Sequence, residues 1–129
     1  MKKNQQLLTF ARQAMQNAYA PYSKLKVGAA ILTPSGNIYT GCNVENISYP
    51  CGNCAETGAI STMVTAGEYK ISKIAIISNG NFEIKPCGAC LQRIKEFSNQ
   101  KTEIITLTPD DIIKIHKISE LLPTPFEEL

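Results

Sequence analysis

The chain has 129 residues, of which 43% are hydrophobic, and a formal net charge of +2. This length predicts one domain, residues 1–129, and the apolar content excludes a disordered chain. The small charge argues against a nucleic-acid groove or an anionic membrane surface, and a small neutral or weakly charged ligand fits the composition at least as well.

The first half of the chain predicts a helix, a hairpin and a loop. Apolar residues at helical spacing indicate a helix over about Asn4–Tyr19, which Pro21 ends. Residues 26–33 and Ile38–Cys42 read as two strands joined by the turn "PSGN", as in a hairpin. Residues 43–53 have the Asn, Gly, Pro and Ser content of a loop.

The second half predicts alternating helices and strands. The expected elements are a helix over residues 54–67, a buried strand over 72–78, a helix over about 87–97 opened by Pro86, strands over 102–108 and 111–118, and a last helical turn over 119–123. This order is typical of an α/β protein. We predict a three-layer α/β/α sandwich in which helices cover both faces of a mixed five-stranded sheet.

The N-terminal segment argues against a signal peptide, and the single histidine excludes a His-rich metal site. The stretch "MKKNQQLLTFARQ" lacks the long apolar run of a signal peptide, so we expect a cytoplasmic protein with reduced cysteines. His116 is the one histidine, which excludes a His-rich metal site. It alternates with apolar residues in "IIKIHKI", so we expect it on the outward face of a strand.

The most informative feature is a pair of Cys-x-x-Cys motifs, Cys51 with Cys54 and Cys87 with Cys90. Two such pairs commonly form a closed structural zinc site with four thiolates. However, Cys54, Cys87 and Cys90 fall at the starts of two predicted helices, whose N-termini favour thiolates, whereas Cys51 lies in the preceding loop. If Cys51 stays away, the fourth zinc position is open to water, and Glu56 is placed to carry its proton. Both interpretations remain open at this point.

Five stretches then indicate a family. They are "APYSKLKVGAAIL", "GCNVENISYP", "CAE", "PCGACLQ" and "ELLP", in this order. Cys-x-Glu followed by Pro-Cys-x-x-Cys is the signature of zinc deaminases in its three-cysteine form. Over nearly its whole length the chain resembles the short, homotetrameric cytidine deaminases. The resemblance implies a cytidine deaminase-like fold, one Zn²⁺ per chain on Cys54, Cys87 and Cys90, and Glu56 as proton shuttle.

The resemblance also implies the reaction and the substrate contacts. Cytidine or 2′-deoxycytidine, as a free nucleoside, would be hydrolysed to the uridine with release of ammonia, a step of pyrimidine salvage. The residues that match the family's substrate contacts are Asn43 and Glu45 for the ribose hydroxyls, the Ala55 backbone for the pyrimidine carbonyl, Leu25 where many relatives pack a phenylalanine on the nucleoside, and Tyr49 and Phe126, which reach a neighbour's active site in the tetramer.

These residues also have ordinary structural interpretations. Asn43 and Glu45 are compatible with polar loop positions, Phe126 with a core side chain, and Tyr49 with a loop anchor. Cys42 and Cys51 are expected to be small thiols without a role in metal binding.

Two positions depart from the family pattern. Many relatives have an arginine directly after the glutamate and another after the second cysteine of the Pro-Cys-x-x-Cys motif, where this chain has Thr57 and Leu91. Three thiolates and a hydroxide give Zn²⁺ a surplus of negative charge, which such arginines would offset. Our hypothesis from the sequence is that the Thr57 hydroxyl bonds a thiolate and that the helix dipoles supply most of the compensation.

Three rival functions are weighed against this interpretation. A four-cysteine zinc module without catalysis requires Cys51 as a ligand. A redox role requires each Cys-x-x-Cys to act without the other. A nucleic-acid-editing deaminase would need a basic groove with stacking aromatics, which a +2 chain without tryptophan does not offer.

Overall fold

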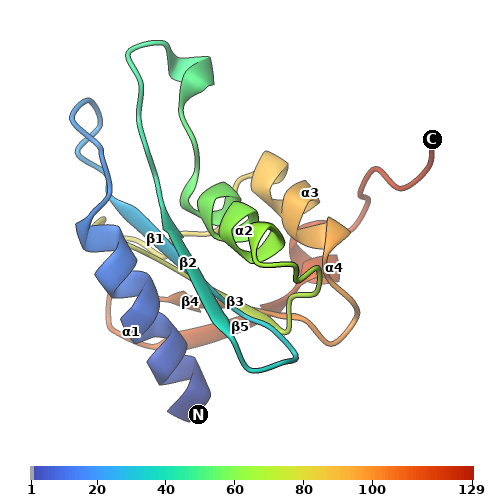
Figure 1. Ribbon diagram of the computed structural model, residues 1–129. Helices are drawn as coiled ribbons and strands as arrows, with labels where there is room; N and C mark the ends of the chain where they lie inside the picture. Colours follow the sequence, from blue (N-terminus) through green and yellow to red (C-terminus); the bar gives the residue numbers. More distant parts are fainter. Residues whose placement is uncertain (1) are drawn as a thin grey trace.

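Residues 2–129 are described by the computed structural model, and their elements alternate as the sequence predicts (Figure 1). The order is α1 (Lys2–Gln16), β1 (Val27–Leu32), β2 (Ile38–Cys42), a 3-10 turn η1 (Tyr49–Cys51), α2 (Ala55–Thr65), β3 (Lys73–Ser78), α3 (Gly88–Glu96), β4 (Glu103–Leu107), β5 (Ile113–Lys117) and α4 (Ile118–Leu121). Within these residues no helix is both long and apolar enough to cross a bilayer.

The strands form one mixed sheet in the order β2-β1-β3-β4-β5. Strand β1 pairs antiparallel with both β2 and β3, β3 pairs parallel with β4, and β4 pairs antiparallel with β5. The hairpin predicted for β1 and β2 is confirmed, with Leu32 opposite Ile38 at its closed end. Because β2 and β3 are both antiparallel to β1, they run in the same direction, and their carboxyl ends lie at one edge of the sheet.

Helices cover both faces of this sheet, which confirms the predicted three-layer sandwich. Helix α1 packs on one face, mainly over β1 and β3, whereas α2, α3 and α4 lie on the other face (Figure 1). Each face has its own apolar core. The α1 core includes Leu7, Ala11 and Ile77, and the opposite core contains side chains of α2 and α3, among them Met63 and Ile94.

Two glycines let the helices approach the sheet closely. A Cβ on Gly28 would lie 2.6 Å from Met15 N of α1, and a Cβ on Gly41 would lie 2.6 Å from Ala55 O of α2. Both obstacles are backbone atoms, which cannot rotate away. The absence of a side chain at Gly41 therefore sets how close the first turn of α2 lies to β2.

The first helix is shorter at its C-terminus than the sequence predicts. It ends at Gln16 rather than Tyr19. The Tyr19 N–H donates to Asn43 O at 3.0 Å, and Tyr19 O accepts from Glu45 N at 2.8 Å. These bonds to the loop after β2 replace the helical bonds of Tyr19, so the chain leaves the helix before Pro21.

His116 is less exposed than the strand pattern predicts. Its side chain is 20% exposed, and its Nε2 lies 3.0 Å from Glu83 Oε2 and 3.2 Å from Thr106 Oγ1. The outward-facing prediction is wrong because the β3–α3 loop, which carries Glu83, covers this part of β5.

Candidate active site

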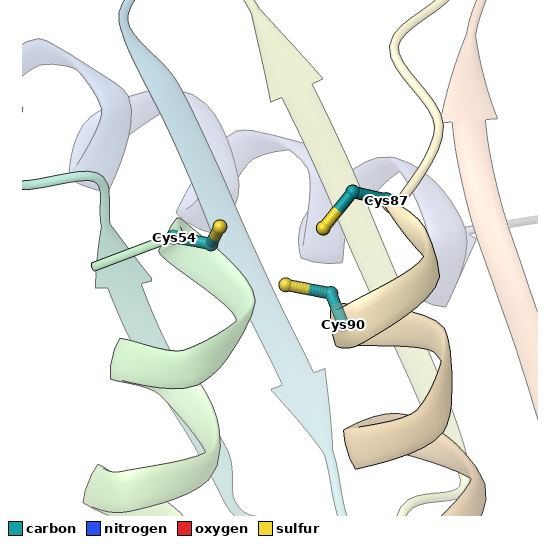
Figure 2. Close-up of side chains that lie close together, drawn as sticks. All are labelled: Cys54, Cys87 and Cys90. Carbon is teal, nitrogen blue, oxygen red and sulfur yellow. The ribbon is translucent and has the colours of Figure 1, made fainter. Parts of the chain in front are cut away.

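Three cysteine sulfurs from two helices meet at one point (Figure 2). Cys54 is the N-cap of α2 and Cys87 the N-cap of α3, while Cys90 lies in the first turn of α3. The three Sγ atoms lie within 4.8 Å of one another. Zn–S bonds of about 2.3 Å place the sulfurs of a tetrahedral site about 3.8 Å apart, so this trio fits a zinc ion after small side-chain adjustments.

The sheet topology explains why these distant segments meet. Helices α2 and α3 follow β2 and β3, whose carboxyl ends lie at the same edge of the sheet with β1 between them. Both helix N-termini therefore lie above that edge. Their free N–H groups and partial positive charge favour thiolates there.

The surroundings affect the three thiols differently. Burial raises the pKa of Cys54 and of Cys90. Burial acts in the same direction on Cys87, but hydrogen bonds from Cys90 and from the Ala89 backbone outweigh it and lower the pKa of that thiol. A bound cation is what ionises such a group of thiols, and this is the chemistry expected of a zinc site.

Cys51 is not part of the sulfur cluster. It lies exposed in η1, and the metal-capable group found among residues 2–129 contains Cys54, Cys87 and Cys90 only. Cys42, at the end of β2, is also outside the group. The arrangement thus favours three sulfur ligands over the four that a closed structural site requires.

Glu56 lies beside this cluster in the first turn of α2 and is 5% exposed. Burial raises the pKa of its carboxyl group, and hydrogen bonds with its own backbone N–H and with Cys90, followed by the charge of Arg93, partly oppose this effect. A carboxyl group with a raised pKa, next to a metal-capable cluster, is suited to taking up and releasing a proton.

A cavity of about 620 Å³ opens onto the cluster. This volume lies within the range of small-molecule sites. Its wall contains Cys54, Cys87 and Glu56, together with residues of the loop before β1, of the loop after β2 and of the β3–α3 loop.

Four of the six predicted substrate-binding residues line this cavity, namely Asn43, Glu45, Tyr49 and Ala55. Leu25 is not part of the wall in the single chain. Phe126 lies elsewhere, with its side chain 67% exposed and its backbone held by the Gln92 amide through bonds of 2.8 and 3.1 Å. The alternative interpretation of Phe126 as a core side chain is therefore wrong, and its role at a neighbour's active site stays a prediction.

Asn43 is held by the loop before β1. Its Oδ1 accepts from Val27 N at 2.7 Å, and its Nδ2 donates to Leu25 O at 2.9 Å. One amide proton and one lone pair of oxygen remain for a ligand. Asn43 is thus an oriented side chain with hydrogen-bonding capacity left over.

Glu45 is held by the same loop. It accepts from Tyr22 N at 2.9 Å, from Ser23 N at 3.1 Å and from the Ser23 hydroxyl. The bonds from Ser23 lower the pKa of Glu45, so an ionised acceptor faces the cavity at neutral pH.

Several wall residues were not identified from the sequence. They include Tyr22 and Ser23, which belong to the stretch "APYSKLKVGAAIL", and Ile84 and Lys85, which directly precede "PCGACLQ". Arg93 was also missed, although its Nη1 lies 3.8 Å from Cys90 Sγ. Its position three residues after Cys90 on one helix was the available signal.

Comparisons with known proteins agree with this geometry. The family model described as the cytidine and deoxycytidylate deaminase zinc-binding region matches residues 1–106. A cytidine deaminase of Sporosarcina psychrophila is 36% identical over 124 residues, covering 96% of this chain and 91% of the relative. A cytidine deaminase of Mycoplasma genitalium is 38% identical over 115 residues, covering 88% of each chain.

Solved structures give the same result. The crystal structure of cytidine deaminase from Burkholderia pseudomallei superposes with a TM-score of 0.88 at 37% identity, covering 95% of this chain and 98% of the other. That of cytidine deaminase from Mycobacterium tuberculosis gives a TM-score of 0.84 at 33% identity, covering 96% and 97%.

Proposed function

Since this chain belongs to the cytidine and deoxycytidylate deaminase family, we propose that Cys54, Cys87 and Cys90 hold its zinc ion and that Glu56 moves the protons of its reaction. The chain is an enzyme, a zinc-dependent cytidine deaminase that hydrolyses cytidine to uridine and ammonia. The observation that carries the residue assignment is the convergence of three sulfurs beside the buried Glu56 carboxyl group at the wall of one cavity.

The metal and Glu56 have separate tasks. Bound zinc supplies a Lewis acid that lowers the pKa of a water molecule from 15.7 to about 7. Glu56 would accept a proton from the attacking water and deliver it to N3 of the pyrimidine while the water oxygen bonds to C4. It would then carry the second proton of that water to the amine as the C4–N bond breaks. Burial raises the pKa of Glu56, which favours both uptake and release.

The wall residues orient the nucleoside. Asn43 and Glu45 bind the ribose hydroxyls, for which both retain hydrogen-bonding capacity, and their carbonyl and carboxylate oxygens are already held by the loop over residues 22–27. The Ala55 backbone N–H, at the N-terminus of α2, donates a hydrogen bond to the pyrimidine carbonyl oxygen. These groups serve a 2′-deoxycytidine as well, because the 3′-hydroxyl is common to both substrates.

The active enzyme is proposed to be a homotetramer with shared active sites that serves pyrimidine salvage in the cytoplasm. Tyr49 at the cavity wall is 81% exposed and Phe126 is 67% exposed in the single chain. Such exposure of large aromatic rings favours their burial against neighbouring subunits, where Leu25 would complete the nucleoside pocket. Analytical ultracentrifugation of the wild type and of Phe126→Ala compares their oligomeric states and so measures how much Phe126 contributes to tetramer formation. A wild type that sediments as a monomer would contradict it.

An ultraviolet assay on cytidine tests the catalytic assignment. Glu56→Gln should lower kcat by about 10²- to 10⁴-fold, the usual contribution of general acid–base catalysis, while one zinc per chain is retained. Glu96→Gln, which neutralises an exposed carboxylate of α3, is the matched control and should retain the wild-type rate. If Glu56→Gln deaminates cytidine as fast as this control, Glu56 is not the proton carrier.

A further inference from the structure

The proposed zinc site lacks the cations at positions 57 and 91 that would offset its charge. Three thiolates and one Zn²⁺ carry a net charge of −1, and the Glu56 carboxylate adds to it when ionised. Leu91 is 7% exposed and belongs to the core beneath α2 and α3. Among residues 2–129, no hydrogen bond joins the Thr57 hydroxyl to a sulfur, so the role that the sequence suggested for Thr57 finds no support in the geometry.

Arg93 occupies the place of such a cation. Its Nη1 lies 3.8 Å from Cys90 Sγ, one helical turn away on α3. Cys90 is 0% exposed, which makes the sulfur poorly reachable by solvent and raises the need for a protein partner. No ion pair to a carboxylate involves Arg93 within the described part of the chain, so the guanidinium charge is available to the sulfur.

The side chain of Arg93 lies in the same groove as that of Thr57. Arg93 and Thr57 both line a groove of about 420 Å³ between α2 and α3. A small residue at position 57 leaves room for a long side chain that comes from α3 instead of α2. A guanidinium is always charged and has five N–H donors, so it serves a thiolate from either helix.

We propose that Arg93 is the positioning residue that supplies, from α3, the positive charge of this zinc site. It acts through Cys90: it holds the sulfur in place for the metal and offsets the negative charge that appears when zinc is bound. This inference rests on the ligand set proposed above. It goes beyond that set, because the family pattern places its cations directly after the glutamate and after the second cysteine.

The test measures zinc binding rather than turnover. Zinc dissociation constants are obtained by competition with a chromophoric chelator for the wild type, Arg93→Gln, Arg93→Lys and Lys95→Gln. Lys95→Gln is the matched control, since it removes one positive charge from the same helix. Arg93 is exposed, so its replacement is compatible with folding, which circular dichroism of the metal-free variants verifies.

Arg93→Gln should weaken zinc binding about 10- to 100-fold, the usual cost of losing a partner of a metal ligand. Arg93→Lys should recover part of this loss, and Lys95→Gln should stay within about twofold of the wild type, because Lys95 lies in the last turn of α3 whereas Cys90 lies in its first. With Co²⁺ as the probe, the sulfur-to-cobalt charge-transfer band should move to longer wavelength in Arg93→Gln only, because a thiolate without a donor gives up electrons more easily.

A double variant tests whether charge is the essential property. Thr57→Arg combined with Arg93→Gln places an arginine in the same groove from the opposite helix and should restore most of the zinc affinity. If Arg93→Gln matches Lys95→Gln in zinc affinity and in the cobalt band, the role of Arg93 is overturned while the ligand set stands. If the wild type binds no zinc, or Cys54→Ala binds it undiminished, the ligand set itself is wrong.

Discussion

Substitution of Gly41 by alanine should disturb the metal centre by displacing helix α2, although none of the three cysteine ligands is changed. Gly41 lies in β2 under the first turn of α2, whose N-cap is Cys54. An added Cβ would lie 2.6 Å from Ala55 O and closer still to Ala59 N. Ordinary contact begins at 3.4 Å, so the helix would have to withdraw by about 0.8 Å or more.

The expected cost follows from this displacement. Overpacking of a filled site typically costs about 1–3 kcal/mol, and here the obstacles are backbone atoms, so we expect the upper part of that range or more. The Cys54 sulfur would move with the helix. Zinc sites tolerate deviations of about 0.2 Å in their bond lengths, so a withdrawal of this size should also weaken zinc binding.

Denaturant unfolding of the metal-free protein and zinc competition measure the two effects. Gly88→Ala is the matched control: it is the same substitution in the other ligand-bearing helix, and a Cβ there meets nothing within 4 Å. That control should be neutral or about 1 kcal/mol more stable, because alanine favours a helix over glycine. If Gly41→Ala is as stable as Gly88→Ala and binds zinc equally well, the close approach does not position α2.

Three further outcomes are expected. Hydrogen bonds with Thr106 and His116 lower the pKa of Glu83 to about 2, so its carboxylate stabilises the fold above its ordinary pKa of 4.5 and this contribution disappears as pH falls toward 2. Glu83→Gln should therefore flatten that part of the curve of unfolding free energy against pH, and an unchanged acid limb would contradict the reasoning. Bonds from three side chains of the β1–β2 hairpin lower the pKa of Glu68 to about 2 in the same sense, and thermal melts between pH 2 and pH 7 should show the same flattening for Glu68→Gln. Cys51→Ala should retain one zinc per chain by metal analysis, and loss of the metal would indicate a four-sulfur site.

The fold was predictable to the extent that its signals are local. Strand Ile38–Cys42 was predicted with its observed bounds, since Pro, Gly and Asn delimit it in the sequence. The end of α1 was missed, because it depends on hydrogen bonds from Tyr19 to residues more than twenty positions away. The strand order β2-β1-β3-β4-β5 was not predicted for the same reason: pairing partners distant in sequence leave no periodic trace.

In the candidate site, too, features with a local signal could be predicted, and features that depend on contacts distant in sequence could not. The two Cys-x-x-Cys motifs and Glu56 could be identified because their spacing within a helix fixes their chemistry. The bonds of Glu45 to the loop at Ser23 could not, since they join segments 22 residues apart. At Thr57 the sequence led to a wrong expectation. Its hydroxyl was expected to take over the role of the missing arginine on the same helix, whereas the cation comes from α3, at Arg93.

The direction of the strands, more than any one residue, makes this arrangement possible. Strands β2 and β3 run the same way on either side of β1, so the two helices that follow them begin at the same edge of the sheet. Three sulfurs, the Glu56 carboxyl group and two positive helix ends are thereby brought together above the amino-terminal end of β1. Since position 57 faces α3 across a shared groove, a charge required at the sulfurs can be provided by either helix. The fold therefore determines where the metal lies, but it does not determine which helix carries the cation that offsets the negative charge of the thiolates. Arg93 on α3 is one of the two possible placements of that cation.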